Sequence, residues 1–434
     1  MPLRLLHLSD IHFGGYGPEW DEDEDQREQL LEDVRGLVAG GGRIDGILVG
    51  GDVAHSGRPQ QYARAREWLD ALVQACGCPA ENVWVVPGNH DVDRARVAAS
   101  AILQEFRGAM RACGLSELDE MLRRRLAEDP CGDALLATLE AYNEFALPWG
   151  CHLSAHRFHW QDATLRLGEK PVVLWGMNSV LVSDGADSGE DSGRGTEANL
   201  LLGTHQCRIP RSAGTIRIAL VHHPPNWLKD WTQVKPYVDR AHVVLFGHEH
   251  CFVPEQQRPG GTVYVRAGAV GPEQGPEWAP SYNLLSLDLA GGQLQVHVEP
   301  RSWVVTDTCF GLHDDGKRTF TVVLDEPLGA ARETSEQDRA TETVAEPANA
   351  TPLSAGPSDD GARAGDAEGA GRRRELVFRY LSAARTRREE IARELGVFDE
   401  DDVGLPEGEF YAAILRRIRD RELIDQLARE LGHD

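Results

Sequence analysis

The chain is 434 residues long, too long for one small core, and this length predicts two or three folded units or one large α/β unit with an appendage. Its 70 Asp and Glu against 45 Lys and Arg give a formal net charge of -25, which argues against a broad basic surface for duplex DNA or anionic lipid. No run approaches the ~18 apolar residues of a membrane span, and the first eight residues lack a signal peptide's charged and apolar regions, so we expect a cytoplasmic protein.

Short apolar segments alternate with helical stretches from residue 1 to about residue 325, a rhythm typical of an α/β fold. The predicted strands are Leu3–Leu8, Ile44–Val49, Val83–Val86, Val172–Trp175, Ile216–Val221, Val243–Phe246, Val263–Val265, Tyr282–Leu289, Gln293–Val298 and Thr319–Leu324. Gly291 and Gly292 indicate a hairpin between two of them. Apolar spacings of three and four between Asp93 and Gly150 predict a helical cap insertion at about residues 93–150.

The composition changes after residue 325. Residues 326–371 are rich in Ala, Gly, Pro, Ser, Thr, Glu and Asp and poor in large apolar side chains, which predicts a disordered linker. Helical periodicity resumes over residues 372–434, where we expect a small all-α domain. The expected organisation is therefore an α/β domain over 1–325, a linker and a C-terminal helical domain.

Five polar clusters each follow a predicted strand. They are Asp10-Ile11-His12, Gly50-Gly51-Asp52, Gly88-Asn89-His90-Asp91, His222-His223-Pro224 and Gly247-His248-Glu249-His250. The ends of strands at an open sheet edge are where α/β folds usually bind ligands. Carboxylates, imidazoles and one amide are a donor set for Mn, Fe or Zn, and a carboxylate can bridge two cations that clamp a phosphoryl group.

These five clusters, in this order and after strands, resemble the calcineurin-like metallophosphoesterase superfamily over roughly residues 1–325. The resemblance implies a four-layer sandwich, with two mixed β-sheets flanked by helices. It also implies a dinuclear centre, with manganese favoured over iron and zinc. The first cation would be held by Asp10, His12, Asp52 and His250, and the second by Asp52, Asn89, His222 and His248.

The doubled histidine leaves two choices for one ligand. We favour His222 because family members with one histidine place it directly after the strand, and His223 is the alternative, also a candidate for substrate binding. The resemblance places His90 beside the scissile phosphate as a catalytic residue, where it binds substrate together with Asn89. A metal-bridging hydroxide would be the nucleophile.

Asp91, the second catalytic candidate, has several possible roles. It could orient His90, orient the Asn89 loop, or cap the following helix near Asp93. His55 could contact substrate or be an ordinary loop residue.

Other side chains also leave alternatives open. His152, His156 and His159 have helix-like spacings that admit a third metal, although no carboxylate accompanies them. Trp20, Trp227 and Trp231 could stack on a nucleobase or pack the cap.

Residues 372–434 combine an amphipathic helical pattern with the turn Asp401-Asp402-Val403-Gly404-Leu405-Pro406 and the run Arg416-Arg417-Ile418-Arg419-Asp420-Arg421-Glu422-Leu423-Ile424. In these features they resemble the effector-associated or death-like adaptor modules of bacterial signalling and defence systems, and the alternative is a helical bundle that self-associates. The predicted function is therefore hydrolysis of a phosphodiester, with a cyclic or other nucleotide as the candidate substrate and a protein partner at the C-terminal domain. The alternatives are a non-catalytic nucleotide sensor or adaptor, a phosphoprotein phosphatase and a nuclease. We expect the protein to bind neither a membrane nor duplex nucleic acid.

Overall fold

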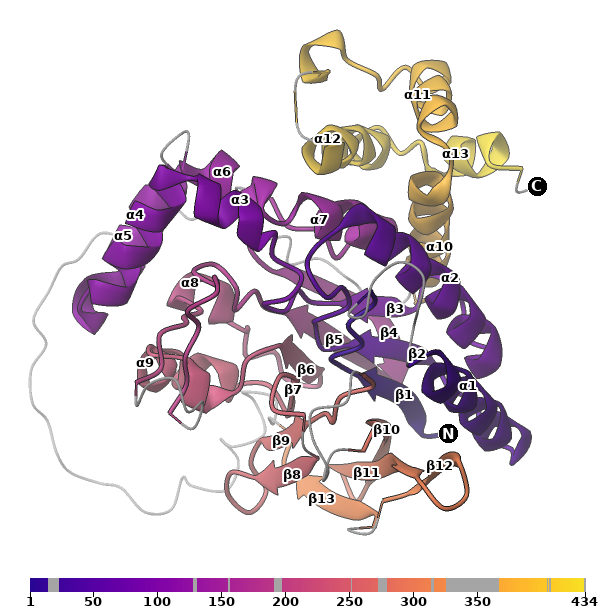
Figure 1. Cartoon of the computed structure of the whole chain (residues 1–434). Helices are drawn as coiled ribbons and strands as arrows, with labels where there is room; N and C mark the ends of the chain where they lie inside the picture. Colours follow the sequence, from indigo (N-terminus) through magenta and orange to yellow (C-terminus); the bar gives the residue numbers. More distant parts are fainter. Residues whose placement is uncertain are drawn as a thin grey trace, which may run out of the picture.

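The computed structural model describes residues 1–14, 23–127, 131–154, 157–190, 197–250, 252–271, 279–313, 316–324, 367–403, 405 and 407–432. Two β-sheets form its centre, helices cover their outer sides, and a group of C-terminal helices stands beside them (Figure 1). Both sheets contain parallel and antiparallel pairs. The predicted sandwich of two mixed sheets with a separate helical C-terminal part is therefore confirmed.

The first sheet has seven strands in the order β12-β11-β10-β1-β2-β3, with β13 paired to β11. Their bounds are β1 Leu3–Leu8, β2 Gly46–Val49, β3 Val83–Val85, β10 Ser281–Ala290, β11 Gln293–Val304, β12 Cys309–Leu312 and β13 Arg318–Val322. β1, β2 and β3 are parallel, so their carboxyl ends meet at one edge. The predicted hairpin is the β10–β11 pair, in which Ala290 lies opposite Gln293.

The second sheet has six strands in the order β4-β5-β6-β7-β9-β8. Their bounds are β4 Trp160–Leu167, β5 Lys170–Gly176, β6 Ile216–Val221, β7 Val243–Phe246, β8 Val253–Gln256 and β9 Val263–Arg266. Alternate residues of a strand face opposite sides. Accordingly, Ile218 and Leu220 of β6 belong to the core shared with the first sheet, whereas Ala219 and Val221 belong to the core on the outer side.

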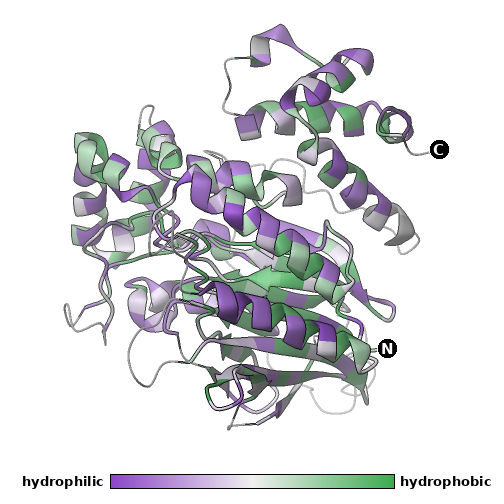
Figure 2. Cartoon of the chain, turned by 45° about the vertical axis from the view of Figure 1, so that its right-hand side comes forward, coloured by the Kyte–Doolittle hydropathy of each residue, from purple (hydrophilic) through white to green (hydrophobic). Residues whose placement is uncertain are grey.

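Helices complete the outer layers. The first sheet is covered by α1 (Glu24–Ala39) and α2 (Pro59–Cys76), whose polar faces point outward (Figure 2). The stretch predicted to be helical contains α3 Arg94–Ala99, α4 Ala101–Ala112, α5 Leu115–Ala127, α6 Cys131–Ala137, α7 Glu140–Ala146 and the 3-10 helix η1 Leu147–Trp149. Parts of α4, α5 and α6 share the outer core of the second sheet with α8 (Thr204–Cys207) and α9 (Trp231–Val238).

The C-terminal helices form a core of their own. Their bounds are α10 Ala367–Ser382, α11 Arg385–Glu394, η4 Glu400–Asp402, α12 Glu407–Asp420 and α13 Ile424–Glu430. Tyr380, Ile391 and Ile414 are fully buried among them, and Leu147 of η1 joins the same cluster. The part of the predicted linker from residue 326 to residue 366 lies outside the described residues.

Arg374 of α10 fastens these helices to the sandwich. Its Nη1 lies 2.6 Å from Asp162 Oδ2 of β4, and its Nε donates to the Glu81 carbonyl over 3.0 Å. The guanidinium carbon also lies 4.6 Å from the centre of the Trp84 ring, an arrangement that favours a cation–π contact. The C-terminal helices are therefore docked against the end of the sandwich that carries β3 and β4.

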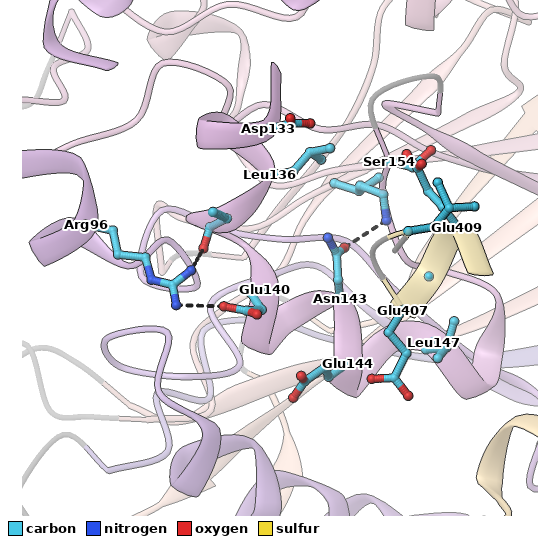
Figure 3. Close-up of a pocket in the computed structure, with 14 residues that line it drawn as sticks. Arg96, Asp133, Leu136, Glu140, Asn143, Glu144, Leu147, Ser154, Glu407 and Glu409 are labelled. Atoms are coloured by element: carbon cyan, nitrogen blue, oxygen red, sulfur yellow. Dashed lines mark hydrogen bonds and ion pairs between the residues drawn. The ribbon is translucent and has the colours of Figure 1, made fainter. Parts of the chain in front are cut away.

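A cavity of about 490 Å³ separates this helical part from α7. Glu140 and Glu144 of α7 line one side and Glu407 and Glu409 of α12 the other, as Figure 3 shows. None of the residues that line it is a predicted site residue. Among the described helices, none is long and apolar enough to cross a membrane.

Candidate metal centre

Every predicted site residue lies just past the carboxyl end of a strand. Asp10 and His12 follow β1, Asp52 follows β2, Asn89, His90 and Asp91 follow β3, His222 and His223 follow β6, and His248 and His250 follow β7. Because these strands come from both sheets, the centre lies where the sheet edges meet, near the middle of Figure 1. The sequence separations are large, yet the side chains converge.

The first group gathers around Asp10. Its Oδ1 lies 3.1 Å from His250 Nε2, and its Oδ2 accepts from the backbone N–H of His248 over 2.9 Å. His12 Nε2 lies 3.8 Å from Asp10 Oδ1 and 3.9 Å from Asp52 Oδ2. Both ring nitrogens of His12 are buried without a hydrogen-bond partner, so this side chain offers a lone pair that no protein donor uses.

The second group gathers around His222. Its Nε2 lies 3.3 Å from Asp52 Oδ2 and 3.2 Å from Asn89 Oδ1. Its Nδ1 donates to the Gly50 carbonyl over 2.8 Å, which turns Nε2 toward Asp52 and Asn89. The His248 ring centre lies 5.2 Å from that of His222. Acceptor atoms thus face one another, as expected around a cation.

His223 is placed differently from its neighbour. Its Nε2 lies 3.1 Å from Asn89 Oδ1, and its Nδ1 lies 2.8 Å from Ser179 Oγ. Its imidazole is held between two uncharged polar groups. Ser179 was not a predicted site residue, although it follows β5 as the predicted residues follow their strands, and that position was the available signal.

Four sets of donor atoms lie within 4.8 Å of one another in the described part of the chain: His12, His55 and His90; Asp10, His12 and His250; Asp10, Asp52 and His222; and His222, His223 and His248. They overlap through His12, Asp10 and His222, and Asn89 Oδ1 touches the last set. Carboxylate oxygens with neutral imidazoles are suitable ligands for Mn, Fe or Zn. The orphaned His12 nitrogens and this donor set fit a metal site.

Burial and neighbouring charges set the protonation of these groups. Burial lowers the pKa of His12 and of His248 to about 3, so both rings are neutral at physiological pH. Burial tends to raise the pKa of Asp52, but the nearby His222 and His90 charges outweigh it and hold the pKa well below its usual value. The Asp52 carboxylate is therefore ionised, and His12 and His248 carry free lone pairs, as metal binding requires. Burial lowers the pKa of His222 and of His250 too, but the charges of Asp52 and Asp10 outweigh it and raise the pKa, to about 9 for His222, so these two rings would release a proton on binding a cation.

The backbone around the centre is strained. The five residues at the ends of β1, β2 and β7 with positive φ, between 52° and 72°, are Asp10, His12, Asp52, His248 and His250. Non-glycine residues rarely adopt this left-handed conformation, which costs roughly 1 kcal/mol or more for each. Such strain gathers where the surrounding structure imposes a functional geometry.

Gly88 makes room for the carboxylate of Asp52. A Cβ at Gly88 would lie 2.1 Å from Asp52 Oδ1 and 2.5 Å from its backbone nitrogen. The position therefore admits no side chain while Asp52 stays in place.

His90 lies beside the centre with its orientation fixed. Its Nδ1 donates to the His55 carbonyl over 2.8 Å, and its backbone N–H donates to Asp52 Oδ1 over 2.7 Å. Its ring centre lies 4.6 Å from that of His12. Because the carbonyl can only accept, Nδ1 carries a proton, and Nε2 remains free for another contact.

Asp91 braces the loop that carries Asn89 and His90. Its carboxylate accepts from Gly88 N and Ala54 N over 2.9 Å and from Tyr62 Oη over 2.7 Å. Burial, followed by the charge of Asp52, raises the pKa of Asp91 to about 6. Helix α3 is capped by Asp93 instead, which accepts from the backbone of two residues in its first turn.

Other candidate residues lie elsewhere. His159 stacks on Trp175 with ring centres 4.9 Å apart, and neither it nor His152 joins a potential metal-binding group among the described residues. His156 and Trp20 are outside the described residues. Trp227, in the 3-10 helix η2 (Pro225–Trp227), meets the His248 ring edge to face at 4.1 Å, so one predicted tryptophan does flank the centre.

The fold and site define an α/β sandwich with a buried carboxylate–histidine centre at the strand ends. The chain belongs to the calcineurin-like phosphoesterase family, whose model matches residues 3–252. Residues 372–432 match the GTPase-associated adaptor domain.

Several known proteins are similar to parts of the chain. A protein named "Probable cyclic nucleotide phosphodiesterase" from Rhodococcus erythropolis is 34% identical over 87 residues, 20% of this chain and 28% of that protein. A cAMP/cGMP dual specificity phosphodiesterase from Mycobacterium tuberculosis is 38% identical over 93 residues, 21% of this chain and 28% of that protein. The chain thus spans less than a third of the length of these curated relatives. Among solved structures, Chaetomium thermophilum Vps29 is 12% identical with a TM-score of 0.31, over 74% of this chain and 98% of that one.

Proposed function

We propose that the chain is a dinuclear metal-dependent phosphoesterase that hydrolyses a phosphodiester. The observation that carries the proposal is the position of Asp52 between two groups of potential ligands: its Oδ2 lies 3.9 Å from His12 Nε2 and 3.3 Å from His222 Nε2. Sharing of one carboxylate is the arrangement that two neighbouring cations require. Membership of the calcineurin-like phosphoesterase family supports the same reaction class.

The ligand assignment follows the contacts. Asp10, His12, Asp52 and His250 would hold the first cation, and Asp52, Asn89, His222 and His248 the second. His222 is preferred to His223 because its Nε2 lies 3.3 Å from Asp52 Oδ2, the oxygen that also faces His12. Manganese is the favoured metal, because oxygen and imidazole donors suit it and thiolates are absent from the potential binding groups in the described part.

When bound, the two cations supply Lewis acidity for the phosphoryl oxygens and an activated water as the nucleophile. The protein's own residues then place and protonate the substrate. The His55 carbonyl fixes the His90 ring, so His90 meets a phosphoryl or leaving oxygen through Nε2. Asp91 acts as a positioning residue because its hydrogen bonds hold the loop that presents His90.

The proposed substrate class is a nucleotide phosphodiester, a cyclic nucleotide being one candidate. The support is that two relatives, each similar over 28% of its length, are named as cyclic nucleotide phosphodiesterases. His223 would set the position of Asn89 through the 3.1 Å contact between His223 Nε2 and Asn89 Oδ1. It would reach the substrate only from the Asn89 side of the centre.

The C-terminal helices would recruit a protein partner in bacterial signalling or defence. The match of residues 372–432 to an adaptor domain supports this role. The docking of Arg374 onto β4 and Glu81 would keep that partner next to the hydrolase domain. The proposed location is the cytoplasm.

The test uses the purified full chain loaded with manganese. We expect turnover of bis-p-nitrophenyl phosphate, with slower turnover of p-nitrophenyl phosphate. Asp52→Asn should lose both metal and turnover because it removes the shared carboxylate. Asp307→Asn, at an exposed residue, is the matched control and should retain both. No turnover of either substrate by protein with two bound metals per chain would contradict the proposal.

A further inference from the structure

His55, a basic side chain that is not a predicted metal ligand, lies on the His90 side of the centre, and Arg94 is its charged neighbour. The His55 ring centre is 5.2 Å from that of His90 and 6.0 Å from that of His12. Ring nitrogens of these three histidines lie within 4.8 Å of one another. Burial of His55 lowers its pKa, and the charges of His90 and then Arg94 lower it further, which places Arg94 within electrostatic reach of His55.

Both side chains have polar groups without partners. Within the described part of the chain, His55 Nδ1 and Arg94 Nε are buried and make no hydrogen bond. The neighbouring arginines are paired: Arg58 bonds Asp93 over 3.0 Å, and Arg96 bonds Glu140 over 2.7 Å. Unlike these two neighbours, Arg94 has no carboxylate partner among the described residues.

The three histidines could suggest a third cation, but the charges argue against it. The Arg94 guanidinium is always positive and lies near His55, so it would repel a cation there. His12 is already required next to Asp10 and Asp52. Orphaned N–H groups beside a permanent positive charge are instead suited to phosphate oxygens.

We propose that His55 and Arg94 form a subsite for a second anionic phosphate oxygen of the substrate, beyond the one ionised oxygen of a scissile diester. This inference rests on the proposed phosphoester hydrolysis, and among the candidate substrates it favours phosphoesters that carry a second negative charge near the scissile phosphorus over singly charged cyclic nucleotides. That charge has two possible sources. It could come from a second phosphate group elsewhere in the substrate or from the second ionised oxygen of a phosphomonoester.

The first measurement compares substrates of different charge on the manganese-loaded full chain. Bis-p-nitrophenyl phosphate carries one negative charge, and p-nitrophenyl phosphate carries two. The p-nitrophenyl ester of thymidine 5′-phosphate, with and without a 3′-phosphate, tests whether the second charge comes from a second phosphate group. Arg94→Gln should lower kcat/KM about 10- to 100-fold for the doubly charged substrate that fits the subsite, the effect of one charge-assisted hydrogen bond, and about threefold or less for its singly charged counterpart.

His55→Gln should show the same charge selectivity with a smaller loss. The matched control is Arg96→Gln on the same helix, because Arg96 points toward Glu140 and the Ala137 carbonyl (Figure 3). It should leave all four substrates unchanged. Equal losses on singly and doubly charged substrates, or no loss in Arg94→Gln, would overturn the inference while leaving the proposed hydrolase intact.

The second measurement does not depend on turnover. Titration calorimetry with inorganic phosphate should give a Kd that rises about 10-fold or more in Arg94→Gln and not in Arg96→Gln. If the wild-type protein binds phosphate through Arg94 but hydrolyses nothing, the subsite stands and the proposed reaction fails. If phosphate binds equally to both variants, the subsite is refuted.

Discussion

Replacing Gly88 with alanine tests the centre without removing any predicted ligand. The added Cβ would lie 2.1 Å from Asp52 Oδ1, whereas an ordinary contact is about 3.5 Å, so the Asp52 carboxylate must shift by about 1.4 Å. Metal–ligand distances tolerate only about 0.2 Å. We therefore expect loss of bound metal and a fall in turnover of about 10²-fold, the size of effect a 1 Å misplacement produces. Overpacking should also cost about 1–3 kcal/mol of unfolding free energy.

The assay measures manganese per chain by mass spectrometry, turnover of bis-p-nitrophenyl phosphate, and unfolding by calorimetry. Gly36→Ala in α1 is the matched control, because an added Cβ there has no atom within 4 Å. It should gain about 0.5–1 kcal/mol from helix propensity and keep its metal. A Gly88→Ala protein with two metals per chain and wild-type turnover would refute the placement of Asp52 as the shared ligand.

Three further predictions concern single side chains. His90→Asn should keep both metals, measured by mass spectrometry, and slow turnover about 10²- to 10⁴-fold, the usual contribution of a general acid; an unchanged rate would remove His90 from the mechanism. Burial lowers the pKa of His152 to about 3 in the folded protein, whereas the pKa in the unfolded chain is about 6.5. Below pH 6.5 the unfolded state therefore binds more protons than the folded state, and stability falls as the pH drops. Between pH 6.5 and 5 the free energy of unfolding should therefore fall by about 2 kcal/mol because of His152. Urea unfolding should show that this contribution is absent in His152→Gln; an equal pH dependence in the variant would contradict the assignment. Arg374→Ala should loosen the attachment of the C-terminal helices, because it removes the bonds to Asp162 and the Glu81 carbonyl. Limited proteolysis should then release these helices faster than in the control Arg385→Ala, at an exposed residue; equal rates would show that Arg374 does not hold the helices.

The strand-end clusters were predictable because two physical regularities coincide in this sequence. Buried strands such as β1, β2 and β6 appear in the sequence as mostly apolar runs. Polar residues that directly follow such strands lie at the sheet edge. Asp10 and His250, 240 positions apart, meet at 3.1 Å for this reason.

Other features depend on partners that sequence spacing does not indicate. β4 was not predicted, because it is an edge strand whose polar Asp162 and Arg166 obscure the alternation. The role of Asp91 stayed open because its partner Tyr62 lies 29 residues earlier. The docking of Arg374 involves atoms of Glu81 and Asp162, more than 200 positions away, and no local pattern predicts it.

The left-handed backbone at Asp10, His12, Asp52, His248 and His250 has a consequence for engineering. Glycine or asparagine would relieve that conformation, so selection for heat resistance alone would favour them at these five positions. Each gain would delete a donor atom from the centre. A thermostable form of this protein should therefore be sought at helix surfaces such as Gly36, with the strand-end loops held constant.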